Sequence, residues 1–262
     1  MSPPSFCEPN HLWSFYVSEL VNTVTSCYLV FFGLCGAYYV RRYGGIVAGE
    51  LRLVFPFLSL AGVGAGSALF HGTGLRSAQL LDEVPMLFVV LSLAYNLSEL
   101  ASPPGKLLRP WLAWLCVAFV LAFIVLYLLV DIYAVFLVSF SSINFYCMVR
   151  GGQLYRELSG RRYALLRAMF VTAMVIFFVG FGAWILDNAI CAQVQNSGLH
   201  GLWHIAAGLG AHNACVNVQL LRTTFGLRRE ARLISHDGHI WYNFLLRRFG
   251  GQGLDAATGR ST

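Results

Sequence analysis

Two histidines in an apolar stretch are the first residues whose spacing suggests chemistry. His200 and His204 are four residues apart in LHGLWHIAAGLGAH, so on a helix both side chains leave one face about one turn apart. A helix can supply two nitrogens to one zinc ion with this spacing. The pattern is similar to HExxH but contains no glutamate, so a general base must come from elsewhere. The alternative is that both imidazoles only hydrogen-bond across helices.

Three further residues could complete a hydrolytic zinc site. His71 offers a third nitrogen, and three histidines plus water make an open catalytic site. Ser67 precedes His71 by four residues and would place a hydroxyl beside the metal, while Asp82 is the nearest candidate for the base. Each has a plainer interpretation: His71 as a structural histidine, Ser67 as a small residue that allows close helix packing, and Asp82 with Glu83 as helix-start acids.

Membrane helices must position these residues, because the chain is far more apolar than a soluble domain. Of its 262 residues, 57% are hydrophobic and 11% charged, and the mean hydropathy is +0.64. Crossing the hydrocarbon takes about 20 mostly apolar residues as a helix, which satisfies every backbone polar group internally. Seven segments meet this requirement: residues 21–40, 53–71, 79–97, 110–130, 132–149, 165–187 and 200–221. The sequence therefore predicts an all-α membrane protein, with a seven-transmembrane helix bundle in residues 1–222 and a tail at 223–262.

The predicted spans bring the chemically active residues to one depth. His71 ends the second span, Asp82 lies near the start of the third, and Asp187 ends the sixth. His200 and His204 open the seventh. Ionisable side chains inside a membrane are costly and usually face the bundle interior beside a partner. Their convergence favours one catalytic site over a set of unrelated structural residues.

The distribution of lysine and arginine predicts the orientation of the bundle. All of the 18 basic residues except Arg76 fall on the side that carries the C-terminal tail. Cytoplasmic segments are enriched in Lys and Arg, so we expect the N-terminus outside or in the lumen and the C-terminus in the cytosol. The same asymmetry explains the net charge of +6 without a nucleic-acid partner.

Only two of the seven cysteines lie in segments that this topology places outside the cytosol, namely Cys7 and Cys191. An oxidising lumen would let them form a disulfide between the N-terminal segment and the loop before the last span. Two unpaired thiols are the alternative.

Four stretches of the chain resemble the alkaline ceramidase family. They are CEPNHLWSFYVSELVNTVTS, GVGAGSALFHGTGLRSAQLLDEVPMLF, WILDNAIC and LHGLWHIAAGLGAH. Together they cover the region of the seven predicted spans, and the motifs QLLDE-x-PM and LH-x-x-WH in this order are specific.

The resemblance implies an intramembrane zinc-dependent amidohydrolase that cleaves the N-acyl bond of ceramides to a sphingoid base and a free fatty acid. It implies catalytic roles for Ser67 and Asp82, and zinc bound by His71, His200 and His204. It also supports the disulfide, and it implies a membrane lipid as substrate and the endoplasmic reticulum or Golgi membrane as the location.

A calcium site near the N-terminus is implied as well. Glu8, Asn10 and Glu19 match the oxygen ligands that this hard cation prefers. The family pattern starts this site with an aspartate and a tryptophan directly before the cysteine, where this chain has Ser5 and Phe6. The loss of one carboxylate is expected to weaken calcium binding. A solvated segment and a helix-start acid are the plainer interpretations of Glu8 and Glu19.

The main alternative is a seven-span receptor of the progestin and adiponectin receptor type, which has a similar histidine-rich zinc site. Resemblance to that group implies the reverse orientation, with the N-terminus in the cytosol. The loop charges argue against this orientation. A retinal-binding protein needs a lysine in its last helix, whereas the only lysine, Lys106, lies in a predicted loop.

Overall fold

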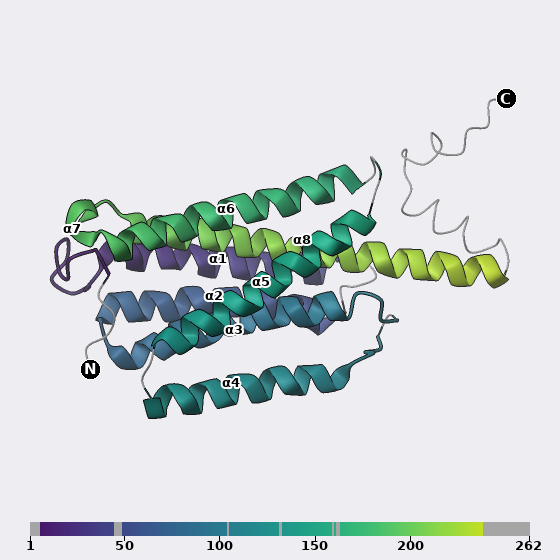
Figure 1. Cartoon of the computed structure of the whole chain (residues 1–262), viewed down its shortest axis with the longest axis horizontal. Helices are drawn as coiled ribbons and strands as arrows, with labels where there is room; N and C mark the ends of the chain where they lie inside the picture. The colour runs from purple at the N-terminus through teal and green to yellow at the C-terminus, as the bar shows by residue number, and fades with distance from the viewer. Residues whose placement is uncertain are drawn as a thin grey trace.

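The computed structural model describes residues 6–44, 49–103, 105–130, 133–158, 160 and 163–237, with the backbone alone for 226–237. The regular secondary structure of these residues is helical (Figure 1). Eight helices are formed: α1 (Leu20–Tyr43), α2 (Leu51–Thr73), α3 (Arg76–Ser98), α4 (Pro110–Val130), α5 (Tyr133–Glu157), α6 (Ala164–Ala189), α7 (Cys191–Val194) and α8 (Leu199–Asp237). Ser5, one of the residues expected near calcium, lies outside the described residues.

Most of the long helices run in nearly the same direction, and α5 crosses the others obliquely (Figure 1). Helices α1, α2 and α3 form successive contacts, and α8 packs on α1 and α6, which lie far from each other in the sequence. Helix α4 packs on α3 and α5 at the edge of the bundle. The main apolar core lies between α1, α2, α3 and α8 and includes Leu29, Phe57, Leu60, Leu93 and Val218.

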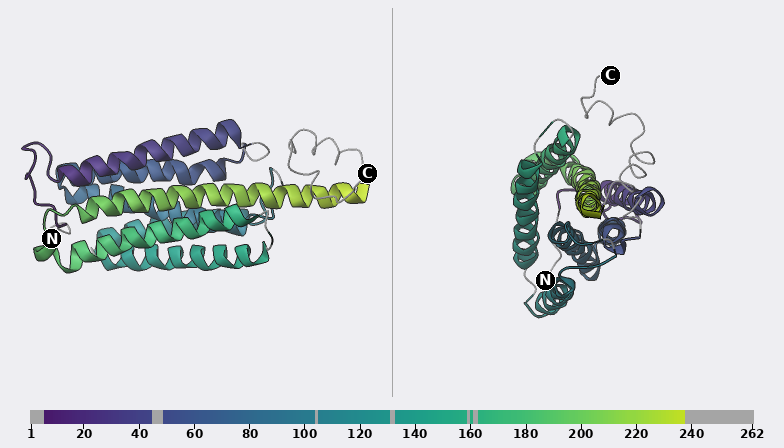
Figure 2. Two further views of the ribbon diagram at one scale, coloured as in Figure 1. Left: turned by 90° about the horizontal axis from the view of Figure 1, so that it is seen from above. Right: turned by 90° about the vertical axis from the view of Figure 1, so that its right-hand side faces the viewer.

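Among the described residues, six helices, α1 to α6, are long and apolar enough to cross a membrane. Helix α8, which includes the expected seventh span, is not among the six. It carries histidines and asparagines along its length, among them His200, His204, His212 and Asn217, and these lower its mean hydropathy. It also continues past residue 222, the expected end of the bundle, and projects beyond the other helices (Figure 2).

Glycines let α2 approach both of its neighbours closely. A Cβ atom on Gly64 would lie 2.6 Å from the backbone nitrogen of Val30 in α1. A Cβ on Gly66 would overlap the carbonyl group of Leu81 in α3 and lie 2.9 Å from the nitrogen of Asp82. Small residues allow this type of backbone contact between membrane helices. The contact at Gly66 brings the end of α2 against the part of α3 that carries Asp82.

Proline contributes to the same contact. Pro85 lies inside α3 and has no N–H to donate to the carbonyl of the residue four positions earlier. That residue is Leu81, whose carbonyl faces Gly66. The two helices therefore meet where the hydrogen-bond ladder of α3 is interrupted.

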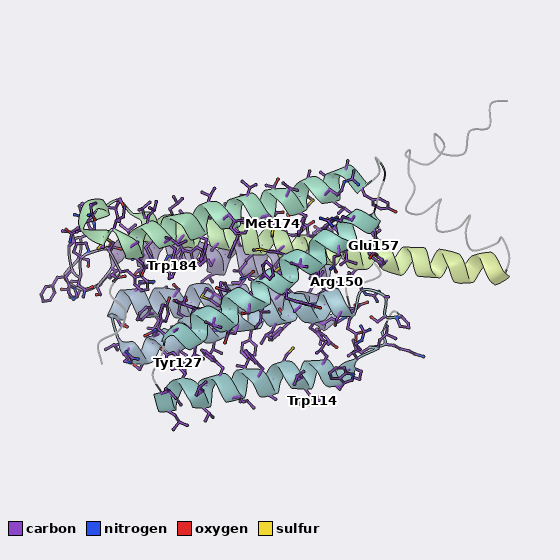
Figure 3. The ribbon with its side chains drawn as sticks, in the orientation of Figure 1. Trp114, Tyr127, Arg150, Glu157, Met174 and Trp184 are labelled. Atoms are coloured by element: carbon purple, nitrogen blue, oxygen red, sulfur yellow. A yellow bond between two sulfur atoms is a disulfide. The ribbon has the colours of Figure 1, made fainter. Side chains whose placement is uncertain are left out.

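A buried ion cluster joins the helices at the opposite end of the bundle. Glu50 accepts hydrogen bonds from Arg222 at 2.7 Å and from Arg52 at 2.6 Å. Arg222, which is 1% exposed, also donates to the carbonyl of Leu100. This cluster joins α8 to the start of α2 and to the loop after α3. In Figure 3, Arg150 and Glu157 lie toward this end, whereas Trp184 and Tyr127 lie toward the other.

Candidate active site and metal centre

Three histidines from two helices meet inside the bundle. His71 lies in the last turn of α2, and His200 and His204 lie in the first turns of α8. One ligand nitrogen from each lies within 4.8 Å of the others, and the three side chains are 2%, 4% and 5% exposed. The group can therefore hold a metal ion, as the spacing of the histidines predicts.

The orientation of His71 is fixed by a carboxylate from α1. Its Nδ1 lies 2.6 Å from Oε2 of Glu19, the residue directly before α1. Burial raises the pKa of the Glu19 carboxyl to about 7, against the lowering effect of the hydrogen bond from the Asn22 amide. Because Nδ1 is occupied, Nε2 of His71 is left as a buried atom without a protein partner. A histidine whose Nδ1–H is bound by a carboxylate presents Nε2 to a metal.

The other two histidines also have oxygen atoms beside Nδ1. Nδ1 of His200 lies 3.8 Å from Oδ2 of Asp187 in α6, and Nδ1 of His204 lies 3.0 Å from the hydroxyl of Thr25 in α1. A hydrogen bond at Nδ1 leaves Nε2 of His71 and of His204 to bind a metal, whereas Nδ1 of His200 is buried without a hydrogen-bond partner. The donor set of three buried neutral nitrogens fits zinc.

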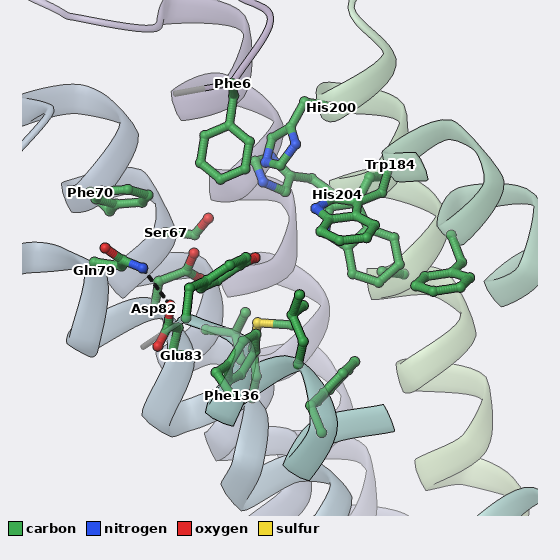
Figure 4. A pocket seen from close by; sticks show the side chains of 18 of the residues that line it. Phe6, Ser67, Phe70, Gln79, Asp82, Glu83, Phe136, Trp184, His200 and His204 are labelled. Atoms are coloured by element: carbon green, nitrogen blue, oxygen red, sulfur yellow. Dashed lines mark hydrogen bonds between the residues drawn. The ribbon is translucent and has the colours of Figure 1, made fainter. Parts of the chain in front are cut away.

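Ser67 and Asp82 lie together beside the histidines. Ser67, 2% exposed, accepts a hydrogen bond from the hydroxyl of Ser26 at 3.0 Å and hydrogen-bonds to Asp82. Both residues line the pocket that His200 and His204 also line (Figure 4). The structure thus brings together the hydroxyl, the carboxyl and the histidines that the sequence predicts for one site.

The pocket encloses about 780 Å³ of empty space, part of it open to the surroundings. Its polar residues lie mainly on α2, α3 and the start of α8, and its remaining walls are largely aromatic and aliphatic. The apolar walls include Leu29, Phe136, Phe140, Phe181 and Trp203. The pocket is therefore suited to a ligand with a small polar part and long apolar parts.

The residues expected near calcium have partners within the protein. The Glu8 carboxylate accepts hydrogen bonds from the backbone nitrogens of Val21 and Asn22, at 2.8 and 2.9 Å, and so caps α1. Oδ1 of Asn10 accepts a hydrogen bond from the hydroxyl of Ser18. Glu8 and Glu19 both contact Asn22, through its backbone and its side chain respectively.

Phe6 covers the histidines. Its ring centroid lies 3.9 Å from that of His200 and 5.1 Å from that of His71. A disulfide joins the next residue, Cys7, to Cys191 at the start of α7, with the Cα atoms 5.3 Å apart. The backbone nitrogen of Cys7 also donates to Asp187 at 3.3 Å. The N-terminal segment is therefore attached directly over the metal-binding group.

The sequence reasoning missed two polar residues of the pocket. Gln79 and Glu83 line it from α3, although Glu83 was interpreted only as a helix-start acid. Gln79 lies three residues before Asp82 and four before Glu83, so it shares a helix face with both, and this spacing is a signal in the sequence that could identify the pair. The contacts of Glu19 and Asp187 with the histidines depend on tertiary packing and have no local signal.

The chain is similar to several alkaline ceramidases. Alkaline ceramidase 3 of Mus musculus is 26% identical over 219 residues, which cover 79% of this chain and 79% of the relative. Alkaline ceramidase of Drosophila melanogaster is 28% identical over 222 residues, covering 82% and 75%, and alkaline ceramidase YPC1 of Saccharomyces cerevisiae is 26% identical over 250 residues, covering 83% and 75%. The ceramidase family profile matches residues 1–242. The chain is therefore a member of the ceramidase family.

Proposed function

We propose that this protein is an intramembrane zinc-dependent amidohydrolase that cleaves the N-acyl bond of ceramides, yielding a sphingoid base and a free fatty acid. The observation that carries the proposal is the group of three buried imidazoles beside Ser67 and Asp82, in a pocket that is otherwise largely apolar. Family membership supports ceramide as the substrate class, and it gives no support to the receptor alternative.

Amide hydrolysis needs an activated water and a protonated leaving group. A zinc ion held by His71, His200 and His204 would supply Lewis acidity, acidifying water and polarising a carbonyl oxygen. Asp82 accepts the proton of the attacking water and delivers it to the nitrogen as the C–N bond breaks, because an amine is too basic to leave unprotonated. Ser67 donates a hydrogen bond to the carbonyl oxygen as negative charge develops there.

The topology proposed for this activity has seven spans, with α8 as the seventh and residues 1–222 as the catalytic domain. The N-terminus lies outside or in the lumen, and the tail at 223–262 lies in the cytosol. The supporting observation is that Arg52 and Arg222 lie at the end of the bundle away from the histidines, as the positive-inside rule requires for a site near the lumenal face. An endoplasmic reticulum or Golgi membrane follows from the family resemblance.

A calcium ion near the N-terminus is part of the same proposal. Glu8, Asn10 and Glu19 would supply oxygen ligands, with Ser5 and Phe6 in place of the aspartate and tryptophan of the family pattern. The proximity of Glu8 and Glu19, which both contact Asn22, is the support for it.

The test is a comparison of two histidine variants of α8 in purified protein. His204→Ala should lose both the stoichiometric zinc and the hydrolysis of ceramide. His212→Ala is the matched control, because His212 packs between the rings of Phe32 and Phe57 on the same helix and should retain zinc. Full zinc content in His204→Ala would remove the metal assignment, and zinc-loaded wild-type protein that cleaves no ceramide would remove the function.

A further inference from the structure

Gln79 and Glu83 form a polar pair in the pocket that amide hydrolysis does not use. They lie one turn apart on α3 and are 2% and 3% exposed. Nε2 of Gln79 donates a hydrogen bond to Oε1 of Glu83 at 2.6 Å (Figure 4). Pairs with this spacing are common on helices, and this pair lines the pocket.

The hydrogen bond between them leaves two acceptor atoms without partners. Because the amide donates and the carboxylate accepts, the remaining atoms are Oε1 of Gln79 and Oε2 of Glu83, and both are buried and unpartnered in the protein. A buried acceptor without a partner is destabilising. Two such atoms in one pocket indicate a ligand that carries hydrogen-bond donors.

The position of Gln79 and Glu83 in the pocket indicates which groups of the ligand they contact. Glu83 directly follows Asp82, and both residues line the pocket with Ser67. An amide whose carbonyl and nitrogen lie at Ser67 and Asp82 therefore has its nearest substituents close to Gln79 and Glu83. In a ceramide those substituents include the hydroxyl groups on carbons 1 and 3 of the base, one bond from the carbon that bears the nitrogen, whereas the two chains are apolar.

We propose that Gln79 and Glu83 form a subsite that binds the hydroxyl groups of the sphingoid base, and thereby select hydroxylated N-acyl bases over simple N-acyl amines. This proposal adds a subsite for the substrate to the proposed function, and it rests on that function. Oε1 of Gln79 and Oε2 of Glu83 accept the hydrogen bonds, and the Gln79–Glu83 bond holds both acceptors in place. A site built to bind a hydroxyl discriminates against a ligand that lacks it, because its own polar groups are then left unpaired.

The experiment measures kcat/KM for three substrates with the same acyl chain: a ceramide, its 1-deoxy analogue and its 3-deoxy analogue. The wild-type protein should prefer the ceramide by roughly 10- to 100-fold over at least one analogue, the range for leaving a buried polar group without its partner. The affected analogue identifies the hydroxyl. In Glu83→Gln and Gln79→Met, the preference should fall towards unity, with the rate on the ceramide reduced more than the rate on that analogue.

Ser92→Ala is the matched control. Ser92 is a buried residue of the same helix that bonds to the carbonyl of Val89, and its loss should leave the substrate preference unchanged. Equal wild-type rates on all three substrates would overturn the subsite without any variant, and so would variants that lose activity equally on all of them. A wild-type protein that cleaves none of the substrates would instead overturn the proposed function, and the subsite with it.

Discussion

The carboxylate of Glu19 lies 2.6 Å from Nδ1 of His71, so a residue at the start of α1 orients a histidine at the end of α2. The backbone nitrogen of Glu19 also donates to the carbonyl of His71 at 3.0 Å. The two residues are therefore joined at both the side chain and the main chain. This contact makes the metal-binding group depend on the N-terminal segment as well as on its ligands.

Replacement of Glu19 should weaken metal binding although Glu19 is not one of the three histidines. In Glu19→Ala, His71 loses the acceptor that fixes its ring and its tautomer, and loss of such a partner lowers metal affinity by about 10- to 100-fold. A zinc titration with a competing chelator measures this. Glu99→Gln is the control, because Glu99 is a buried carboxylate at the other end of the bundle that accepts hydrogen bonds from the backbone nitrogens of Leu108 and Arg109, just before α4. Equal affinities in wild type and Glu19→Ala would contradict the prediction.

Replacement of the proposed base should separate metal binding from turnover. Asp82→Asn keeps the size of the side chain but cannot accept a proton, so we expect full zinc content and a rate lower by about 10²- to 10⁴-fold. Zinc content and single-turnover hydrolysis are measured on the same preparation. A near-normal rate would show that the base lies elsewhere in the pocket.

The hydroxyl of Ser67 should contribute to the rate and leave zinc content unchanged. Ser67→Ala removes a donor to the developing oxyanion, which costs about 3–4 kcal/mol in comparable sites, or a reduction in kcat of about 10²- to 10³-fold. Ser59→Ala is the control, since Ser59 is a buried serine of the same helix that bonds only to its own helix at Phe55. If the two variants have similar kcat values, Ser67 has no part in catalysis.

Two glycines of α2 allow a test of the close contact with α3. A Cβ on Gly66 would overlap the Leu81 carbonyl, whereas a Cβ on Gly62 would lie 3.5 Å from Cβ of Pro85, an ordinary contact. Overpacking costs about 1–3 kcal/mol, so Gly66→Ala should lower the Tm and the activity. Gly62→Ala should be neutral or stabilising, because alanine favours a helix by about 1 kcal/mol over glycine. Thermal unfolding in detergent measures both, and equal Tm values would contradict the close contact.

Reduction of the disulfide should release the segment that covers the histidines. Cys7→Ser removes a cross-link between residues 184 positions apart, and such links typically contribute about 2–4 kcal/mol. We expect a lower Tm and a Tm that no longer responds to a reducing agent. Cys27→Ser, at an exposed free cysteine, should behave as wild type does. A Cys7→Ser protein whose Tm still falls on reduction would point to another disulfide.

The parts of the site that follow helix periodicity could be predicted from the sequence. His200 and His204 share a helix face because they are four residues apart, and the same holds for Ser67 and His71. The depth of these four residues in the membrane could be estimated from the ends of the apolar segments. The meeting of α2 and α8 at one end of the bundle could therefore be expected. The boundaries of the first six apolar segments also agree with α1 to α6 to within a few residues at most ends.

The remaining features depend on contacts that no local pattern encodes. The partnership of Glu19 with His71, and of Asp187 with His200, arises only when α1 and α6 pack beside the histidines. The contact of the Phe6 ring with His200 depends on where the N-terminal segment lies, and the next residue, Cys7, is joined to Cys191 by the disulfide. The end of the expected seventh span is set by the thickness of the hydrocarbon layer. Helix α8 continues past residue 222, because a helix can continue in water.

The polar and apolar walls of the pocket differ in how tightly their helices pack against each other. Helices α1, α2, α3 and α8 pack tightly together, whereas α5 and α6, which supply Phe136 and Phe181 to the opposite wall, have fewer contacts with each other, among them the contact of Tyr155 with Phe170. Under the proposed function, a two-chained lipid would reach the histidines from the surrounding bilayer past this wall, and the fluidity of that bilayer would then influence the turnover rate.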